Sequence, residues 1–192
     1  NLFDIQQENN FAFFQKLEKK EFDLLYFLAS DELNFDKENE FIIYQGSHGD
    51  KIAQIADVIL PSPAYTEQNG LFINLEGRLQ KAVKVTNPIG SSKEDWKIFN
   101  LLNKKIKNNE LFTNYKELID DTLSKVKNNT GFDSLPNLET KNIKLKKGEL
   151  VSEKILIREI DYYFSNAIAR ASKTMSDCKL IKSKKNQNRL TG

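Results

Sequence analysis

The segment with the clearest capacity for ligand chemistry is Gly46-Ser-His-Gly-Asp50, which follows an apolar run and precedes the helix predicted over Lys51–Ala56. Ligands of open α/β sheets bind beyond the carboxyl ends of strands, and free N–H groups at a helix start attract anions. The loop could therefore hold a phosphate. Against this, Asp50 would repel a phosphate, and the spacing matches neither a Walker loop nor a dinucleotide fingerprint. We favour a tight turn in which Asp50 caps the helix.

The chain has one His and one Cys, and this restricts the chemistry further. His48 could be a general base, but only Asp50 lies near it and no nucleophile does, so we set aside a hydrolase and favour a structural or interface role. A Cys178–His48 dyad would need a mutual geometry that nothing in the sequence indicates. Iron–sulfur clusters and structural zinc sites need about four Cys or His ligands, so neither is expected here.

Three charged residues flank two predicted turns: Glu67, Glu76 and Arg78. Paired carboxylates could perform acid–base catalysis. We favour instead an ion pair of Glu76 or Glu67 with Arg78 that fixes the turn geometry. Exposed ion pairs of this kind contribute only about 0–1 kcal/mol to stability.

Aromatic and basic clusters raise the question of nucleic-acid binding. Phe11 and Phe14, and the cluster Tyr162–Phe164, could stack on bases, but no interleaved Arg or Lys accompanies them, so core or interface packing is favoured. Residues 179–192 carry five basic residues and no acidic one, and could contact RNA, anionic lipid or an acidic protein surface, or remain solvated.

The overall composition excludes several classes of protein. The net charge is +2 over 192 residues, so the body of the chain has no strongly positive electrostatic potential of the kind that attracts nucleic acid. The longest apolar runs, such as Phe22–Ala29, have strand length, well short of the roughly 20 residues of a membrane span. A single Cys fits a reducing compartment. Because the chain starts at Asn1 and a helical pattern begins at once, we expect the carboxyl-terminal piece of a longer protein.

The amino half predicts buried strands at 21–29, 41–44 and 58–60, preceded by an amphipathic helix that ends near Lys20. With the helix at 51–56, these elements predict parallel strands with crossover helices. The turn signals Asn69-Gly70 and Glu76-Gly77 separate alternating segments that predict a β meander. The alternating residues are Leu71, Ile73, Leu75, Leu79, Lys81, Val83 and Val85.

The carboxyl half predicts helices. Ser92 and Asp95 resemble a capping box before a helix, and a second helix could start at Thr113. A linker is expected at 128–138 and short strands at 143–145 and 154–157. A further helix is predicted over Ile160–Met175, or a shorter one from Ser165. The two first helix faces are Trp96, Phe99, Leu102 and Ile106, and Tyr115, Leu118, Ile119, Thr122, Leu123 and Val126.

The predicted fold class is α/β: a small, mostly parallel sheet with crossover helices plus a β meander, followed by a helical carboxyl-terminal region. The predicted division is a partial α/β domain with the meander at 1–90, a helical region packing on it at 91–178, and a basic disordered tail at 179–192.

Several motifs in a fixed order resemble one family, the large iron–sulfur subunit (the G subunit) of NADH:quinone oxidoreductase, respiratory complex I. That large subunit is itself a relative of molybdopterin oxidoreductases. The resemblance covers roughly residues 22–178. The motifs are Gln45-Gly-Ser-His-Gly-Asp-Lys51, Ala56-Asp-Val-Ile-Leu-Pro61, Asn69-Gly70, Asn74-Leu-Glu-Gly-Arg-Leu-Gln80, Glu94-Asp-Trp-Lys97 and Arg170-Ala-Ser-Lys-Thr-Met-Ser-Asp-Cys178.

The resemblance implies a partial molybdopterin-oxidoreductase-like fold. It places [2Fe–2S] and [4Fe–4S] clusters in the upstream part of the full subunit and no cofactor in this fragment. The Thr-Glu-Thr segment of many molybdenum enzymes is absent near Asp50, so no cofactor contact is carried over to the Gln45–Lys51 loop. Asn166 and Ala167 replace the Asp and Pro usual in the family, which predicts a less broken terminal helix.

By this resemblance the chain would be a scaffold fragment that supports electron transfer from NADH to quinone. We predict no catalytic, cofactor-binding or metal-binding residue in it. Expected partners are other peripheral-arm subunits of complex I and the upstream part of the same subunit, with no nucleic acid and no direct membrane insertion. The expected location is the matrix side of the mitochondrial inner membrane, or the cytoplasmic face of the bacterial one. An exposed apolar patch is also expected. The alternative is a pterin- or nucleotide-binding domain of a molybdopterin-type oxidoreductase.

Overall fold

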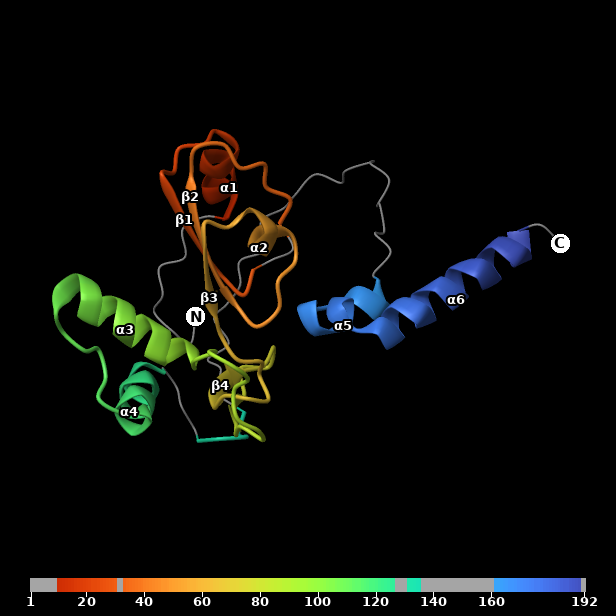
Figure 1. Ribbon diagram of the computed structural model, residues 1–192. Coiled ribbons are helices and arrows are strands. Elements are labelled where there is room, and N and C mark those ends of the chain that lie inside the picture. Colours follow the sequence, from red (N-terminus) through yellow and green to blue (C-terminus); the bar gives the residue numbers. More distant parts are fainter. Residues whose placement is uncertain (1–9, 31–32, 127–130, 136–160, 191–192) are drawn as a thin grey trace, which may run out of the picture. The chain divides into compact units, whose positions relative to one another are not determined.

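The structure is a computed structural model that describes residues 10–30, 33–126, 131–135 and 161–190 (Figure 1). The chain divides into two compact units, residues 1–139 and residues 140–192, and each unit is described by itself. None of the helices in these described ranges is long and apolar enough to cross a membrane.

The first unit is built on a three-stranded parallel sheet in the order β1-β2-β3. Its strands are β1 (Leu24–Leu28), β2 (Phe41–Gly46) and β3 (Val58–Pro61). Helix α2 (Lys51–Ile55) connects β2 to β3, as predicted. The connection from β1 to β2 contains no helix among its described residues, so the prediction of crossover helices is correct for only one of the two connections.

One face of the sheet forms the core of the first unit. Alternation along β1 and β2 points Leu25, Phe27, Ile42 and Tyr44 to this face, where α2 and helix α1 (Asn10–Glu18) pack on them. Burial of apolar surface here is the main stabilising term, because each large aliphatic side chain contributes about 1.5–3 kcal/mol. The most deeply buried residues of this core are Ile42 on β2 and Ile52 on α2.

The opposite face of the sheet is also apolar but only partly covered. Helix α3 (Asp95–Lys107) lies against it, with the Phe99 ring stacked on that of Tyr26 at a centroid distance of 5.8 Å. At the amino ends of the strands, Leu24, Phe41 and Val58 are 54 %, 46 % and 37 % exposed. Parallel sheets usually have both faces covered, and this part of the face provides the expected exposed apolar surface.

Strands β4 (Gly70–Ile73) and β5 (Leu79–Ala82) pair antiparallel as a single hairpin. The predicted meander is therefore one hairpin among the described residues, with its second strand ending before Val83. At the turn, the Asn74 carboxamide oxygen accepts the N–H groups of Glu76 and Arg78 at 3.1 and 2.9 Å. Gly77 has a φ of +82°, a backbone conformation that side chains disfavour.

The start of α3 differs from the prediction, whereas α4 starts at Tyr115, close to the predicted Thr113. The capping box of Ser92 and Asp95 is wrong: Glu94 precedes α3 without a side-chain cap, and the Ser92 hydroxyl donates to the Ile89 carbonyl. Helix α4 (Tyr115–Lys125) does start with side-chain caps, since Asn114 accepts the Glu117 N–H and the Glu117 carboxylate accepts the Thr113 N–H. This reciprocal arrangement satisfies N–H groups that the helix itself cannot pair.

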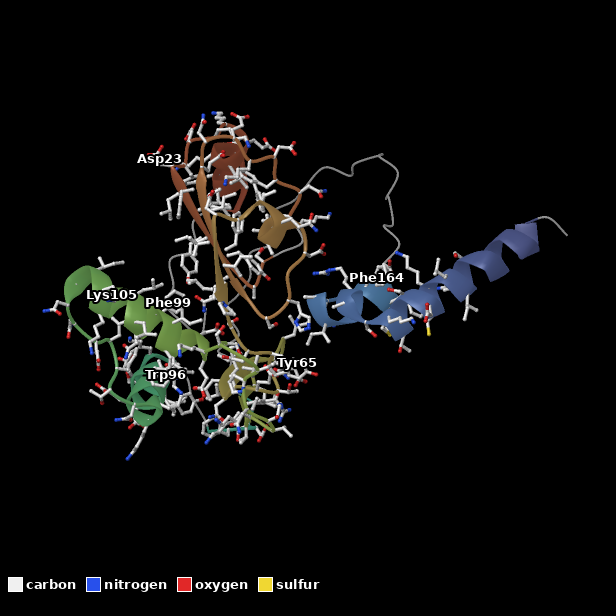
Figure 2. All side chains as sticks on the ribbon, viewed as in Figure 1. Asp23, Tyr65, Trp96, Phe99, Lys105 and Phe164 are labelled. Carbon is white, nitrogen blue, oxygen red and sulfur yellow. The ribbon has the colours of Figure 1, made fainter. Side chains whose placement is uncertain are left out.

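The predicted apolar face of α4 is partly buried throughout, and Val126 at its end is buried. The predicted face of α3 needs one correction. Ile106 is exposed, whereas Ile98, which the spacing left out, is the buried residue of the helix. Phe99 and Trp96 leave α3 on different sides, one against the sheet and one toward α4 (Figure 2).

The second unit contains η1 (Tyr162–Phe164), α5 (Ala167–Ala171) and α6 (Lys173–Leu190). The single helix predicted over 160–175 is therefore wrong, as is the expectation of a less broken terminal helix. The Asn166 side chain accepts the Ala169 N–H at 2.9 Å and so starts α5, and extended backbone at Ser172 separates α5 from α6.

The basic tail also differs from the prediction, because residues 179–190 continue α6 as helix rather than as disordered chain. Lys179 binds the Asp161 carboxylate at 2.6 Å, which ties the start of this stretch to η1. The strands expected at 143–145 and 154–157 lie outside the described residues, as does most of the expected linker. The division at 90/91 and 178/179 stays a prediction.

The core assignment can be tested with Ile42→Ala. We expect the free energy of unfolding of the first unit to fall by about 2–5 kcal/mol, because the substitution leaves a cavity under α1 and α2. Urea unfolding followed by the fluorescence of Trp96, the only tryptophan of the chain, measures this. Ile89→Ala is the matched control, because Ile89 is exposed, and it should change the value by less than about 0.5 kcal/mol. Equal effects of the two variants would refute the assignment.

Candidate functional site at the strand ends

The loop from Gly46 to Asp50 lies where β2 ends and α2 begins, at the carboxyl end of the parallel sheet. The Tyr44 hydroxyl donates to the His48 carbonyl, and a Cβ at position 46 would overlap the Tyr44 ring. His48 is half-buried, with its Nδ1 3.0 Å from the Ser47 hydroxyl. The predicted cap is wrong, since the Asp50 side chain makes no cap hydrogen bond to α2. The loop therefore contacts its own strand through Tyr44 and the segment after β3 through the Ser62 N–H, which donates to the Gly46 carbonyl at 3.1 Å.

A buried polar network lies directly beneath this loop. Gln45 is fully buried, and its carboxamide oxygen accepts the Tyr26 hydroxyl. Its nitrogen donates to one carboxylate oxygen of Asp95 at 2.6 Å, and the Gln68 nitrogen donates to the other at 3.1 Å. Burial, and then the charge of Asp95, raise the pKa of Tyr26, so this hydroxyl keeps its proton and donates it to Gln45. The end of the sheet is therefore joined to the start of α3.

The position of Asp95 determines what this strand end could bind. Its carboxylate binds the Gln45 side chain near the carboxyl end of β2, the end at which ligands of open α/β sheets bind. A fixed negative charge there opposes an anionic ligand. The buried carboxamide of Gln45 is already paired on both of its atoms, so it offers no free group to a ligand. Neither Asp95 nor the paired Gln45 side chain therefore offers a favourable group to an anionic ligand at this strand end.

Glu94 forms a second buried polar group that sequence reasoning did not single out. Its carboxylate accepts the Trp96 indole N–H at 2.7 Å and lies 3.8 and 3.6 Å from the amino groups of Lys84 and Lys97. The nearby Tyr115 hydroxyl is buried without a hydrogen-bond partner among the described residues. Burial, followed by the charge of Glu94, raises the pKa of Tyr115. The motif Glu94–Lys97 contains Glu94, Trp96 and Lys97, and could therefore have indicated this buried polar group from the sequence.

Asp57, in the motif Ala56–Pro61, also has a structural role. Its carboxylate accepts the Ile42 N–H at 2.7 Å and the Lys37 amino group at 2.5 Å, while its own N–H donates to the Ile42 carbonyl at 2.9 Å. These bonds close the amino end of the β2–β3 pair. The hydrogen bond from Ile42, and then the one from Lys37, lower the pKa of Asp57.

The hairpin motif Asn74–Gln80 holds a distant segment. The Arg78 guanidinium donates to the Asp133 carbonyl and lies 3.5 Å from Glu76, so the predicted Glu76–Arg78 ion pair is confirmed. Gln80 donates to the Asp133 carboxylate at 3.3 Å. Glu67 instead accepts the Ala64 N–H at 3.0 Å. These carboxylates fix turns, and nothing in their arrangement suggests acid–base chemistry.

In the second unit, lysines lie on the aromatic cluster, which the sequence reasoning missed. Lys179 lies 4.2 Å from the centroid of the Phe164 ring and Lys182 lies 5.5 Å from that of Tyr163. The signal in the sequence that could have predicted these contacts is a pair of lysines in the helix that follows the aromatic cluster. Cys178 is exposed. It lies in a different unit from His48, so the geometry of a dyad is not tested. Within the described part of the chain, no group of three His, Cys, Asp or Glu residues could hold a metal ion.

Comparison with known proteins places this geometry in a family. The family model described as molybdopterin oxidoreductase matches residues 3–105, which include the whole parallel sheet, the hairpin and most of α3. The chain belongs to the molybdopterin oxidoreductase family. A second model, which describes the C-terminal part of the NADH-ubiquinone oxidoreductase G subunit, matches residues 134–178. The predicted resemblance and the α/β fold class are thereby confirmed.

Curated relatives refine the position of the chain within the molybdopterin oxidoreductase family. It is 41 % identical over 170 residues to the G subunit of NADH-quinone oxidoreductase from Rickettsia felis, covering 88 % of this chain and 25 % of the relative. It is 35 % identical over 180 residues to the NADH-ubiquinone oxidoreductase 75 kDa subunit of Reclinomonas americana, and 37 % identical over 176 residues to the mitochondrial 78 kDa subunit of Candida albicans. These alignments cover 86 % and 80 % of this chain and 24 % and 23 % of those relatives. The chain spans about a quarter of the length of the curated relatives it matches.

The role of Asp57 predicts a defined pH dependence. Because the pKa of Asp57 is lowered from its ordinary value of 3.8, its ionised carboxylate stabilises the folded state at pH values above 3.8. This stabilisation is lost as the pH falls through the lowered pKa. Asp57→Asn should therefore be less stable than the wild type at pH 6, and the difference should shrink below about pH 4. Urea unfolding at several pH values measures this. Lys37→Met should keep most of the effect, since the Ile42 bond is the larger cause. A difference that stays constant down to pH 3 would contradict the assignment.

The buried network predicts coupling between Gln45 and Asp95. Gln45→Ala and Asp95→Ala should each lower the free energy of unfolding by about 1–3 kcal/mol, because each leaves a buried polar partner unpaired. The double variant should lose less than the sum, by about 0.5–3 kcal/mol. Urea unfolding followed by far-ultraviolet circular dichroism measures the cycle. Ser47→Ala, at an exposed neighbouring position, is the control, and additive losses would rule out the network.

Proposed function

We propose that this chain forms the carboxyl-terminal scaffold part of the G subunit of an NADH-quinone oxidoreductase, where it supports electron transfer from NADH to quinone. The observation that carries the proposal is the 41 % identity over 88 % of the chain to a protein of that name. The match of residues 134–178 to the model of the carboxyl-terminal part of this large subunit supports it independently.

A scaffold role is also supported by the way the motif residues are used. Asp57 closes a strand pair, Arg78 holds a distant segment and Gln45 anchors a helix. Each of these side chains reaches another part of the same unit, and each bond ties secondary-structure elements together. In this proposal the chain has no catalytic, cofactor-binding or metal-binding residue of its own.

The residues present do not fit an iron–sulfur cluster. Such clusters take four Cys ligands, or two Cys and two His, and this chain offers one of each. In the proposed function the [2Fe–2S] and [4Fe–4S] clusters are bound by the upstream part of the full subunit, and electrons do not pass through this fragment.

The proposed partners are that upstream part and other peripheral-arm subunits of the complex, with no nucleic acid and no direct insertion into the membrane. The proposed location is peripheral: the matrix side of the mitochondrial inner membrane, or the cytoplasmic face of a bacterial inner membrane. Mitochondrial and bacterial relatives both support a respiratory complex of this kind.

The test is co-purification from native membranes. The tagged protein should elute with NADH oxidation activity and with iron, in a mass far above its own 22.2 kDa. The Ile42→Ala variant, whose core is damaged, should recover less of both, whereas Ile89→Ala should match the wild type. A protein that elutes alone, free of iron and carrying a pterin or nucleotide, would overturn the proposal in favour of a cofactor-binding domain.

A further inference from the structure

Helices α3 and α4 are joined to each other by their own side chains, and we call residues 94–126 the α3–α4 pair (Figure 1). The Asn100 carboxamide nitrogen donates to the Phe112 carbonyl at 2.6 Å. Its oxygen accepts the N–H groups of Leu111 and Phe112 at 2.7 and 3.0 Å. A single side chain in the middle of α3 therefore fixes the segment that leads into α4.

The contacts that attach the α3–α4 pair to the sheet and the β4–β5 hairpin are concentrated at its start. The Asp95 carboxylate accepts carboxamide nitrogens from β2 and from the segment before β4, at 2.6 and 3.1 Å. The neighbouring Glu94 carboxylate lies 3.8 Å from the amino group of Lys84. The Phe99 ring stacks on that of Tyr26. These attachments come from the first turns of a helix that is about 20 Å long.

Beyond Phe99 the α3–α4 pair is held to the sheet only weakly. In the part of the chain that the structure describes, every side-chain hydrogen bond and ion pair of residues 100–126 stays within that range. A groove of about 330 Å³ lies between the end of β3 and the middle of α3. Leu101, which lines this groove, is 50 % exposed. An unfilled gap loses dispersion contacts, so packing at this point contributes little to the attachment.

We propose that the α3–α4 pair opens from the sheet as a unit while the sheet and the core under α1 and α2 stay folded, with the Asp95 carboxylate as the latch. Local opening occurs where buried contacts are few, and contiguous elements open together. Two short helices are marginally stable in isolation, so the pair loses its helical hydrogen bonds when it leaves the sheet. Opening uncovers Tyr26 and the Gln45 carboxamide. The inference goes beyond the proposed function, which assigns no moving part.

Hydrogen exchange of the full chain, read peptide by peptide with mass spectrometry, tests the opening. In the wild type, amides of α3 and α4 should exchange at least about tenfold faster than those of β2, because they open without global unfolding. The decisive variant is Ile42→Ala, which damages the core on the face opposite α3. It should speed exchange in β2 by about 30-fold or more. Exchange in α3 and α4 should stay within about twofold of the wild type, because the closed and open forms share the same damaged core.

Graded variants at the latch test the role of Asp95. Asp95→Ala should speed exchange in α3 and α4 by about 10- to 100-fold, because it leaves the buried Gln45 nitrogen unpaired in the closed form. Asp95→Asn should have a smaller effect, since a carboxamide oxygen can still accept one of the two bonds. Gln68→Ala, which removes only the 3.1 Å bond, is the milder test if Asp95→Ala does not fold. Ser47→Ala, at an exposed position, should match the wild type.

Two outcomes would overturn the proposal. If Ile42→Ala speeds exchange in α3, α4 and β2 alike, the first unit opens only as a whole. If Asp95→Ala or Gln68→Ala leaves α3 and α4 at the wild-type rate, the carboxylate is not the latch. Neither readout depends on respiratory activity, so a failure of the co-purification experiment is distinguishable from a failure here.

Discussion

The hydrogen bonds of the buried Gln45 side chain are the interaction on which the arrangement of the first unit depends. Gln45 accepts a hydrogen bond from β1, through Tyr26, and donates one to α3, through Asp95. A fully buried carboxamide must pair its oxygen and its nitrogen, because an unpaired polar group costs about 1–3 kcal/mol. This requirement fixes where α3 begins and therefore where Phe99 meets the sheet.

The same bonds join the carboxyl end of the sheet to the start of α3. The carboxyl end of β2 is the usual place for an anionic ligand. In this chain Asp95 brings a carboxylate to that place, and Gln68 contacts its second oxygen. The motif residues that signal the family act in the same way. Asp57 and Arg78 bind backbone groups elsewhere in the unit, so their chemistry maintains the fold.

Both faces of the parallel sheet retain some exposed apolar surface, because Ile59 on the core face is 55 % exposed. A parallel sheet with apolar residues on both faces needs partners on both. On the core face, α1 and α2 supply them. On the other face, α3 crosses near Tyr26 and leaves Leu24 and Phe41 exposed. Burial of this remaining surface would be favourable by about 25 cal/mol for each Å² removed from water.

The sequence by itself determined the strands, the hairpin turn and the family, because alternation, turn residues and ordered motifs are local signals. It predicted the parallel sheet and the Glu76–Arg78 pair correctly. Only the tertiary structure decided that Asp95 pairs with Gln45, 50 positions away, instead of capping with Ser92, and that Ile98 is buried in place of Ile106. Similarly, Asn166 starts a separate helix because its side chain accepts the Ala169 N–H. Long-range pairing and burial depend on which surfaces meet, and this information is not contained in local spacing.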